Sequence, residues 1–237
     1  MSPWTICTMS RVAEDLTREL RRLRFVLLAG TALLTLLSAA GCTQYESFEP
    51  GTTPVAMVID SAGYPSVQRN ARPYILARQS RIYPGDRVMT DEQSLVEIEF
   101  EDGHRIRLGT RSQLLVTSHE GDQDRGSPTE TVLTLSSGSL EVTDNQRGNH
   151  RITTSNAVIS SSSPHFWLGY DPAGSELDVV SLAAGKLLVS NQHGEVSLPS
   201  VYASCHVQPG AGPQGAIQWT ESRFQQVKAA HQRINRL

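Results

Sequence analysis

The 237-residue chain contains little of what several function classes require. Aromatic residues make up 6% and charged residues 19% of it, and its formal net charge is -3. Nucleic-acid-binding domains usually concentrate positive charge, so this balance argues against a nucleic-acid partner. With 18 glycines and 12 prolines, the composition is that of an ordinary folded chain, not a disordered, collagen-like or polytopic membrane protein.

Residues typical of catalysis and metal binding are also sparse. The three cysteines, Cys7, Cys42 and Cys205, cannot build a disulfide framework, and none lies in a CxxC or Cys/His zinc spacing. The seven histidines stand singly, without HxH or HExxH, and are expected at turns or on the surface. A serine hydrolase is the enzyme alternative, but no Gly-x-Ser-x-Gly is present. We therefore expect no enzyme activity, no cofactor, no metal site and no small-molecule substrate.

The N-terminal segment has the order of an export signal. Arginines in residues 18–24 precede an uncharged, seventeen-residue apolar run at 25–41, and small residues lead into Cys42. This ending resembles the bacterial lipoprotein signal box, in which the cysteine sulfur takes a diacylglycerol. We expect residues 1–41 to be a signal peptide and Cys42 to be lipidated. A retained membrane anchor is the alternative, although this run would barely span a hydrocarbon core of about 30 Å.

Two details of the leader concern its start and its destination. Met1 and Met9 are both possible starts. Thr43, after Cys42, is not the aspartate that favours inner-membrane retention in enteric bacteria, so we expect a lipid anchor on the periplasmic face of the outer membrane. Cys205 would then be a free thiol in an oxidising compartment, where lone thiols are usually buried.

Composition and periodicity divide the remaining chain into three parts. Residues 42–63 are rich in Gly, Pro, Thr and acidic side chains, which indicates a tether. Residues 64–207 show strand-like alternation broken by glycine and aspartate turns, without a helical period. Residues 208–237 begin with a Gly/Pro linker and end with a predicted helix.

The clearest strand pattern is a hairpin at residues 94–108. Its apolar positions are Val96, Ile98, Phe100, Ile106 and Leu108, with a turn at residues 101–103. Similar short strands recur every eight to twelve residues, and two of them share a Gly-x-Leu-x-Val phrase beginning at Gly138 and Gly185. This predicts an all-β fold of stacked short antiparallel strands, as a β-sandwich, a roll or a short β-solenoid.

The predicted C-terminal helix covers residues 214–237. Its apolar stripe consists of Ile217, Phe224, Val227, Ile234 and Leu237, and its other faces carry Arg223, Lys228, Arg233 and Arg236. Such a helix could pack on the β domain, or dock to a partner or an anionic surface.

The densest aromatic run lies at residues 166–170. Phe166 and Leu168 are expected in the core because they share one face of a strand. Trp167 and Tyr170 are expected to be available to a partner, since exposed Trp and Tyr are frequent binding anchors. Together with Phe224 and Arg233 of the helix, they are the candidate partner-binding residues.

Several segments resemble the FecR domain family in order and spacing. Residues 81–90, with the following hairpin, resemble the opening of a FecR domain through Gly-Asp, Val and Thr. Residues 135–140 look like its Leu-x-x-Gly-x-Leu, 152–158 resemble its Val-x-Thr-Pro-x-Ala, and 179–191 match its closing Val-x-Val-x-x-Gly-x-Val-x-Val. The resemblance covers about residues 64–207.

The resemblance implies an all-β, envelope-facing domain that binds proteins and, in some relatives, passes a signal from an outer-membrane receptor to a sigma-factor regulator. Those relatives carry a cytoplasmic anti-sigma segment before a membrane helix. Only 24 residues precede Phe25 here, so direct sigma-factor control is not expected. The self-cleaving Gly-Thr of some relatives is replaced by Ser163-Pro164, which predicts an uncut chain. We expect an envelope protein partner; binding of peptidoglycan or polysaccharide is the alternative.

Overall fold

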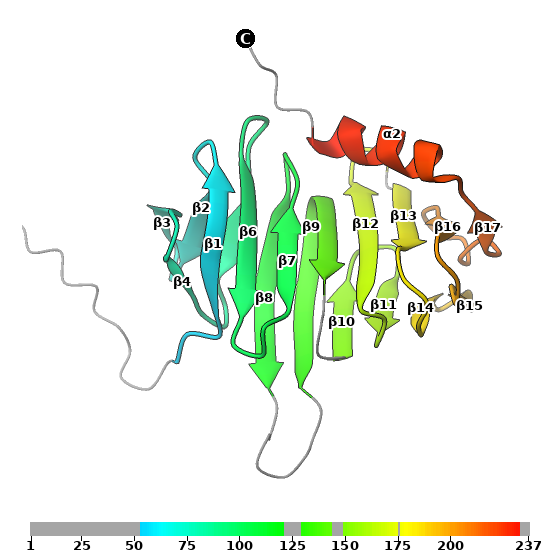
Figure 1. The fold of residues 1–237 in the computed structure, drawn as a ribbon, viewed down its shortest axis with the longest axis horizontal. Coiled ribbons are helices and arrows are strands. Elements are labelled where there is room, and N and C mark those ends of the chain that lie inside the picture. Colours follow the sequence, from blue (N-terminus) through cyan, green and yellow to red (C-terminus); the bar gives the residue numbers. More distant parts are fainter. Residues whose placement is uncertain (1–52, 121–128, 144–148, 175, 233–237) are drawn as a thin grey trace, which may run out of the picture. The chain divides into compact units, whose positions relative to one another are not determined.

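The computed structural model describes residues 53–120, 129–143, 149–174 and 176–232. Nearly all of their regular structure is β, and the chain passes repeatedly between two layers of strands (Figure 1). The first layer has the order β4 (Arg81–Ile82), β1 (Ala56–Ala62), β6 (Leu95–Phe100), β7 (Arg105–Leu108), β9 (Glu130–Thr143), β12 (His165–Asp171), β13 (Glu176–Ser181), β16 (Ala203–Val207) and β17 (Ile217–Gln218).

The second layer shares β9 with the first. Its order is β3 (Arg72–Ile75), β2 (Ser66–Arg69), β5 (Arg87–Met89), β8 (Gln113–Glu120), β9, β10 (Asn149–Thr153), β11 (Val158–Ser161), β14 (Leu187–Asn191) and β15 (Gly194–Ser197). In the described part of the chain, these pairings leave each layer open at both ends, so the strands do not close into a barrel. The predicted mostly-β fold is confirmed.

Strand β9 joins the layers because its two halves have different partners. Its first half pairs with β8 and β10 in the second layer, and residues from Gly138 onward pair with β7 and β12 in the first. The chain turns between the layers at Gly138, whose φ is +87°. A Cβ on Gly138 would lie 2.1 Å from the Ser112 Oγ atom, so only glycine fits this turn.

The pairing of β9 and β10 is parallel, with Glu130 opposite Asn149 and Thr134 opposite Thr153. The expectation of short antiparallel strands is therefore wrong for this pair, and β9 is also long, at 14 residues. Alternation of apolar and polar residues reports which side of a strand is buried, but it carries no information on strand direction. After β9, the chain returns to the second layer as β10. Strand β10 then runs parallel to the first half of β9, as successive turns do in a solenoid.

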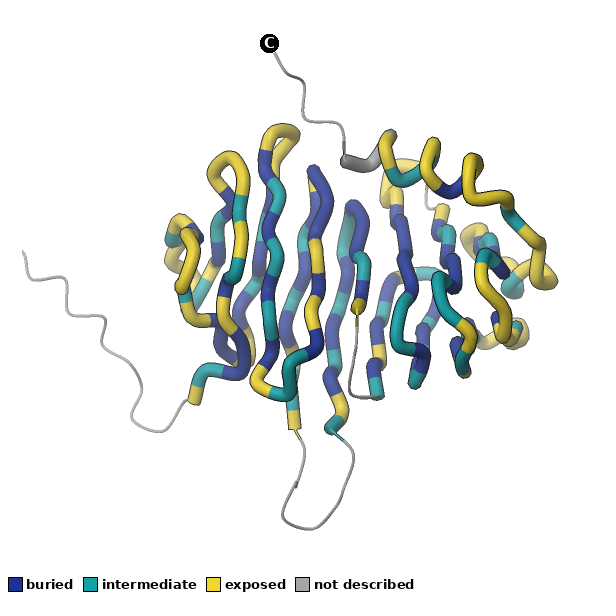
Figure 2. The backbone as a smooth tube through the Cα atoms, viewed as in Figure 1, coloured by how far each residue is buried: buried dark blue, intermediate teal, exposed yellow. Residues whose placement is uncertain are grey.

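The core lies between the two layers and is built from the alternating positions of the strands (Figure 2). The predicted hairpin is confirmed as β6 and β7, with Ile98 opposite Ile106 and both side chains fully buried. Glu97 and Glu99 lie on the other face, where they pair with Arg107 and Arg105. Burial on one face only explains why the period of two is so clear here.

The predicted tether at residues 42–63 is wrong for residues 56–62, which belong to the folded domain. Residues Ala56–Ala62 form β1, which pairs with β4 on one side and β6 on the other. Val58 is fully buried, whereas Met57 is 42% exposed. The short alternation at Ala56 and Val58 lies among Gly, Pro, Thr and Ser, whose abundance indicates a linker when the partner strands are unknown.

The C-terminal helix is shorter than predicted. It begins at Glu221 and is described to Gln232 as α2, the one helix in the described residues. Ile217 is not on the helix but in β17, where it pairs with Ser204 and is 50% exposed. Thr220 explains the start, because its side-chain oxygen accepts a hydrogen bond from the Arg223 amide, 3.2 Å away, as an N-cap does. In the described residues, no helix is long and apolar enough to cross a membrane.

Candidate functional site

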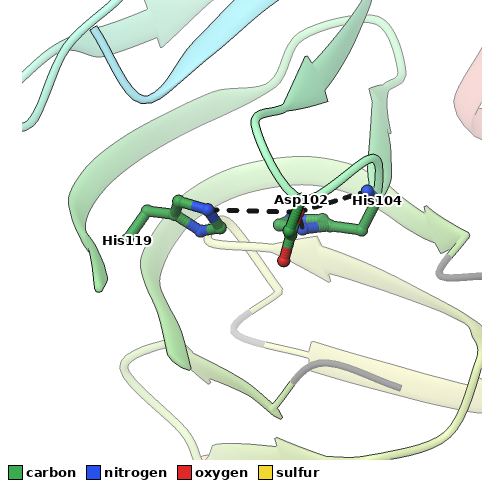
Figure 3. A group of neighbouring side chains, drawn as sticks. All are labelled: Asp102, His104 and His119. Atoms are coloured by element: carbon green, nitrogen blue, oxygen red, sulfur yellow. Dashed lines mark hydrogen bonds and ion pairs between the residues drawn. The ribbon is translucent and has the colours of Figure 1, made fainter. Parts of the chain in front are cut away.

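Asp102, His104 and His119 gather where the β6–β7 turn meets the end of a second-layer strand (Figure 3), and His150 packs beside them. Asp102 and His104 come from the turn, His119 from the end of β8, and His150 from the start of β10. The sequence separates these groups by up to 48 residues, but the pairing of β7, β8, β9 and β10 brings their ends together.

The turn itself directs the Asp102 side chain back toward His104. Gly103 has a φ of +84°, and the Phe100 amide donates to the His104 carbonyl oxygen at 2.9 Å, which closes the hairpin. The His104 amide donates to Asp102 Oδ1 at 3.2 Å. The Asp102 carboxylate therefore accepts a hydrogen bond from a local backbone amide, as aspartates in turns commonly do.

Ring nitrogens face the same carboxylate. His104 Nδ1 lies 2.6 Å from Asp102 Oδ1, and His119 Nε2 lies 3.9 Å from that oxygen. One possible ligand atom from each of Asp102, His104 and His119 lies within 4.8 Å of the other two. The second nitrogen of His119, Nδ1, is 2.8 Å from the Thr131 hydroxyl, which fixes the ring with Nε2 toward Asp102.

Aromatic packing encloses the cluster. The Phe100 ring stacks on His104 at a centroid distance of 4.2 Å and an angle of 13°, and the His150 ring meets His104 edge-on at 4.8 Å. The side chains of His104, His119 and Asp102 are 0%, 6% and 8% exposed. These groups are therefore packed closely and almost excluded from water.

Burial and mutual charge set the protonation of the cluster. Burial lowers the pKa of His119; the Asp102 charge opposes this shift, while His104 and His150 add to it. Burial acts to raise the pKa of Asp102, but the hydrogen bond and charge of His104 outweigh it and leave the pKa below its ordinary value. The cluster thus favours a carboxylate beside a neutral His119 imidazole.

The expectation that the histidines lie singly at turns or on the surface is wrong for His119 and His150, which lie on strands; His104 lies at a turn, as expected, but is buried beside them. His104 and His150 are 0% and 2% exposed, and the His119 side chain is 6% exposed. No local spacing signals this site, because its members lie on separate strands. The available hint was His104 directly after the hairpin turn, at a position that alternates with Ile106 and Leu108 and so faces the core.

A second feature is the apolar contact beneath α2. In β12, Phe166 and Leu168 face the core between the layers, as predicted, and Trp167 points to the outer face of the first layer. There Trp167 is fully buried against Val180 and Phe224, and its ring meets that of Phe224 edge-on at 5.9 Å. In Figure 1, α2 runs across the upper ends of β12 and β13.

The expected exposure of Trp167 is therefore wrong, and so is that of Tyr170. Tyr170 is 5% exposed, and its hydroxyl is hydrogen-bonded to the Ser155 hydroxyl. Phe224 is 3% exposed because it fills the contact with Trp167. Cys42 and Arg233 lie outside the described residues, so their predicted roles stay predictions.

Cys205 is buried, as predicted, at 2% exposure. Its thiol donates to the Gln214 carbonyl oxygen at 3.2 Å. Burial, with a contribution from the charge of Asp178, raises the pKa of the thiol to about 11. At neutral pH this thiol is protonated and shielded, so it does not contribute reactive chemistry.

A comparison with models of known protein families gives a match for the middle of the chain. Residues 86–187 match the family model described as FecR protein. The chain contains a FecR domain. The matched segment begins at Asp86, in the predicted Gly-Asp motif, and ends at Leu187, at the start of β14. It includes the hairpin that carries Asp102 and His104, strand β9, and Trp167 on β12.

Solved structures resemble the chain only distantly. Two crystal structures from Parabacteroides distasonis, both described as a candidate anti-sigma factor, are 10% and 11% identical in sequence, with TM-scores of 0.46 and 0.48. Each alignment covers 59% of this chain, and the chain spans 64% and 62% of the length of the two neighbours. No curated protein matches the chain.

Proposed function

We propose that this protein is a membrane-tethered envelope component whose FecR domain binds another protein in signalling or assembly, without catalysis. The observation that carries the proposal is the FecR match over residues 86–187. Lipidation at Cys42 would supply the tether, and the ten residues from 43 to 52 separate this anchor from the described domain. Fully extended, ten residues reach roughly 35 Å, which is enough to present the domain away from a membrane surface.

The surface proposed to meet the partner is the edge of the second layer at β3. In the described residues, β3 pairs only with β2, so its other side is open to an added strand. Ile75 on β3 is 69% exposed, and the neighbouring Tyr64 is 78% exposed. Exposed apolar side chains at an open strand edge are a frequent feature of peptide recognition.

The alternative function, binding of peptidoglycan or polysaccharide, requires aromatic residues on the surface. The densest aromatic run contains Phe166, Trp167 and Tyr170, and all three side chains are buried. The same burial removes Trp167 and Tyr170 as protein-binding residues, so the preference for a protein partner is based on the FecR match and the open edge of β3.

Site-specific photocrosslinking in cells tests the proposal. A photoreactive amino acid that replaces Ile75 is expected to crosslink to a partner protein. The matched control places this amino acid at position 225, in place of the exposed Gln225 of α2. A crosslinked product at Ile75 but not at Gln225 supports the β3 edge. Retention of the protein on purified sacculi, without a protein product at Ile75, would contradict the proposal.

Mass analysis of the membrane-extracted protein tests the tether separately. A mature chain that starts at Cys42 and carries acyl groups is expected, and Cys42→Ser should abolish both the acyl mass and membrane retention. A mature mass that starts elsewhere would remove lipidation from the proposal.

A further inference from the structure

We propose that Asp102, His104 and His119 form a binding site for a divalent transition-metal ion of the Zn²⁺ class, which ties the β6–β7 turn to the end of β8. The proposal contrasts with the sequence-based expectation of no metal site. It does not depend on the identity of any partner protein.

The spacing of the three donors fits a four-coordinate ion. Bonds of about 2.0–2.1 Å in a tetrahedral site place neighbouring ligand atoms roughly 3.3 Å apart. The distances from Asp102 Oδ1 to His104 Nδ1 and to His119 Nε2 are 2.6 and 3.9 Å, one below and one above that value. The three donor atoms all lie within 4.8 Å of one another, so binding one ion would change these separations by at most about 1.5 Å.

The chemistry of the donors selects the kind of metal. Two imidazoles and one carboxylate suit Zn²⁺ and related ions, whereas Ca²⁺ and Mg²⁺ prefer sites built of oxygen alone. Three protein ligands leave one tetrahedral position for a water molecule. The Asp102 carboxylate would balance part of the charge of the ion within this nearly dry site.

The groups around the donors restrict their movement, as in sites prepared for a metal. The Thr131 hydroxyl, 2.8 Å from His119 Nδ1, orients this ring and leaves Nε2 as the ligand atom. Phe100 stacks on His104 and fixes the plane of its ring. His150 packs against His104 and adds a further imidazole directly beside the site.

The position of the site gives the ion a structural effect. Asp102 and His104 belong to a turn of the first layer, and His119 belongs to a strand of the second. A shared ion would link two layers that in this region otherwise meet through side-chain packing. Binding to the folded state alone would raise the thermal stability in proportion to the logarithm of the free metal concentration.

Metal titration of the purified full chain, with Co²⁺ as the spectroscopic probe and Zn²⁺ as competitor, tests the proposal. One equivalent of Co²⁺ with a tetrahedral visible spectrum, displaced by Zn²⁺, is expected, without the charge-transfer band that a cysteine thiolate ligand would produce. H119Q and D102N each remove a ligand atom and should weaken binding by more than the roughly tenfold to hundredfold that loss of an outer-shell partner costs, or abolish it. Zn²⁺ should also raise the melting temperature of the wild-type chain but not that of H119Q.

The matched control is H206Q. His206 Nδ1 lies 2.9 Å from Asp178 Oδ1, so it forms a histidine–aspartate pair like that of His104 and Asp102 but outside the cluster. H206Q is expected to bind metal like the wild-type chain. Circular dichroism verifies that each variant is folded.

Nuclear magnetic resonance of the wild-type chain tests the proposal without any substitution, so it still applies if the variants do not fold. Imidazole nitrogen resonances of His104 and His119 are expected to shift on addition of one equivalent of Zn²⁺, and those of His206 are not. The proposal is overturned by an absence of stoichiometric binding, by unchanged binding in folded H119Q, or by resonance shifts confined to other histidines.

Discussion

Lys228 of α2 lies with its Nζ atom 2.6 Å from Oε2 of Glu141 on β9, and this pair joins the C-terminal helix to the first layer. The other carboxylate oxygen, Oε1, accepts a hydrogen bond from His165 Nε2 at 2.8 Å. The Lys228 and Glu141 side chains are only 18% and 11% exposed. The pair lies beside the contact of Phe224 with Trp167, since Trp167 is directly opposite Glu141 in the sheet.

Lys228→Ala is expected to loosen α2 without unfolding the β layers. The substitution leaves a mostly buried Glu141 carboxylate with one partner fewer, which is costly at low exposure. Hydrogen exchange should accelerate at least severalfold at the amides of α2 and stay unchanged in β6 and β7. Gln225→Ala, at an exposed position of the same helix, is the control and should leave both rates unchanged. Equal exchange in the two variants would contradict the role of Lys228.

The stability of the protein is expected to fall in acid between about pH 4.5 and pH 2 because of Glu141. Burial acts to raise the pKa of Glu141, but hydrogen bonds from His165 and Lys228, together with their charges, lower it to about 2 from 4.5. A lowered carboxyl pKa contributes stability above the unfolded value, and this contribution is lost as pH falls through the folded value. Arg107 also interacts with this carboxylate.

Urea unfolding as a function of pH measures this effect. Glu141→Gln should be less stable than the wild-type chain at pH 6, and the difference between them should shrink as the pH approaches 2. A constant difference across that range would show that the charge of Glu141 is not the cause.

Gly138→Ala is expected to destabilise the fold by about 2–5 kcal/mol. The new Cβ would lie 2.4 Å from the backbone Cα of Ser112, which cannot move away as the end of a side chain can, and φ is +87°. Gly85→Ala separates the two causes, because Gly85 has a φ of +88° and nothing within 4 Å of its Cβ position. Chemical denaturation should show a clearly smaller loss for Gly85→Ala; equal losses would leave only backbone strain as the cause.

Asp86→Asn is expected to cost about 3–5 kcal/mol, because it removes the charge of a fully buried carboxylate that is paired with the mostly buried Arg69. Asp86 is fully buried and binds the Arg69 guanidinium through both oxygens, each at 2.7 Å. Oδ2 also accepts a hydrogen bond from the Tyr83 amide at 2.9 Å. Thermal denaturation measures the loss.

The exposed pair of Arg111 and Glu92 provides the control for Asp86→Asn. Its side chains are 70% and 61% exposed, so Glu92→Gln should leave the melting temperature almost unchanged. A comparable shift for both substitutions would argue against burial as the cause.

The repeated Gly-x-Leu-x-Val pattern was visible in the sequence, but the sequence did not show why glycine is required at its first position. At Gly138 a Cβ would meet Ser112, and at Gly185 a Cβ would lie 2.9 Å from the Cα atom of Ser163. Both glycines therefore allow another segment to approach the backbone closely. A pattern can reveal that glycine recurs at such a position, but the neighbour that requires it belongs to a distant part of the chain.

By itself, the sequence determined the features in which burial repeats along one strand. The hairpin from Leu95 to Leu108, the inward positions of Phe166 and Leu168, and the burial of Cys205 follow from local alternation and residue type, which report a strand's own environment. The tertiary structure alone decided that Asp102, His104 and His119 meet, and that α2 covers Trp167. Both depend on which distant segments pack together, and that choice results from the summed packing of the whole chain, so no local pattern encodes it.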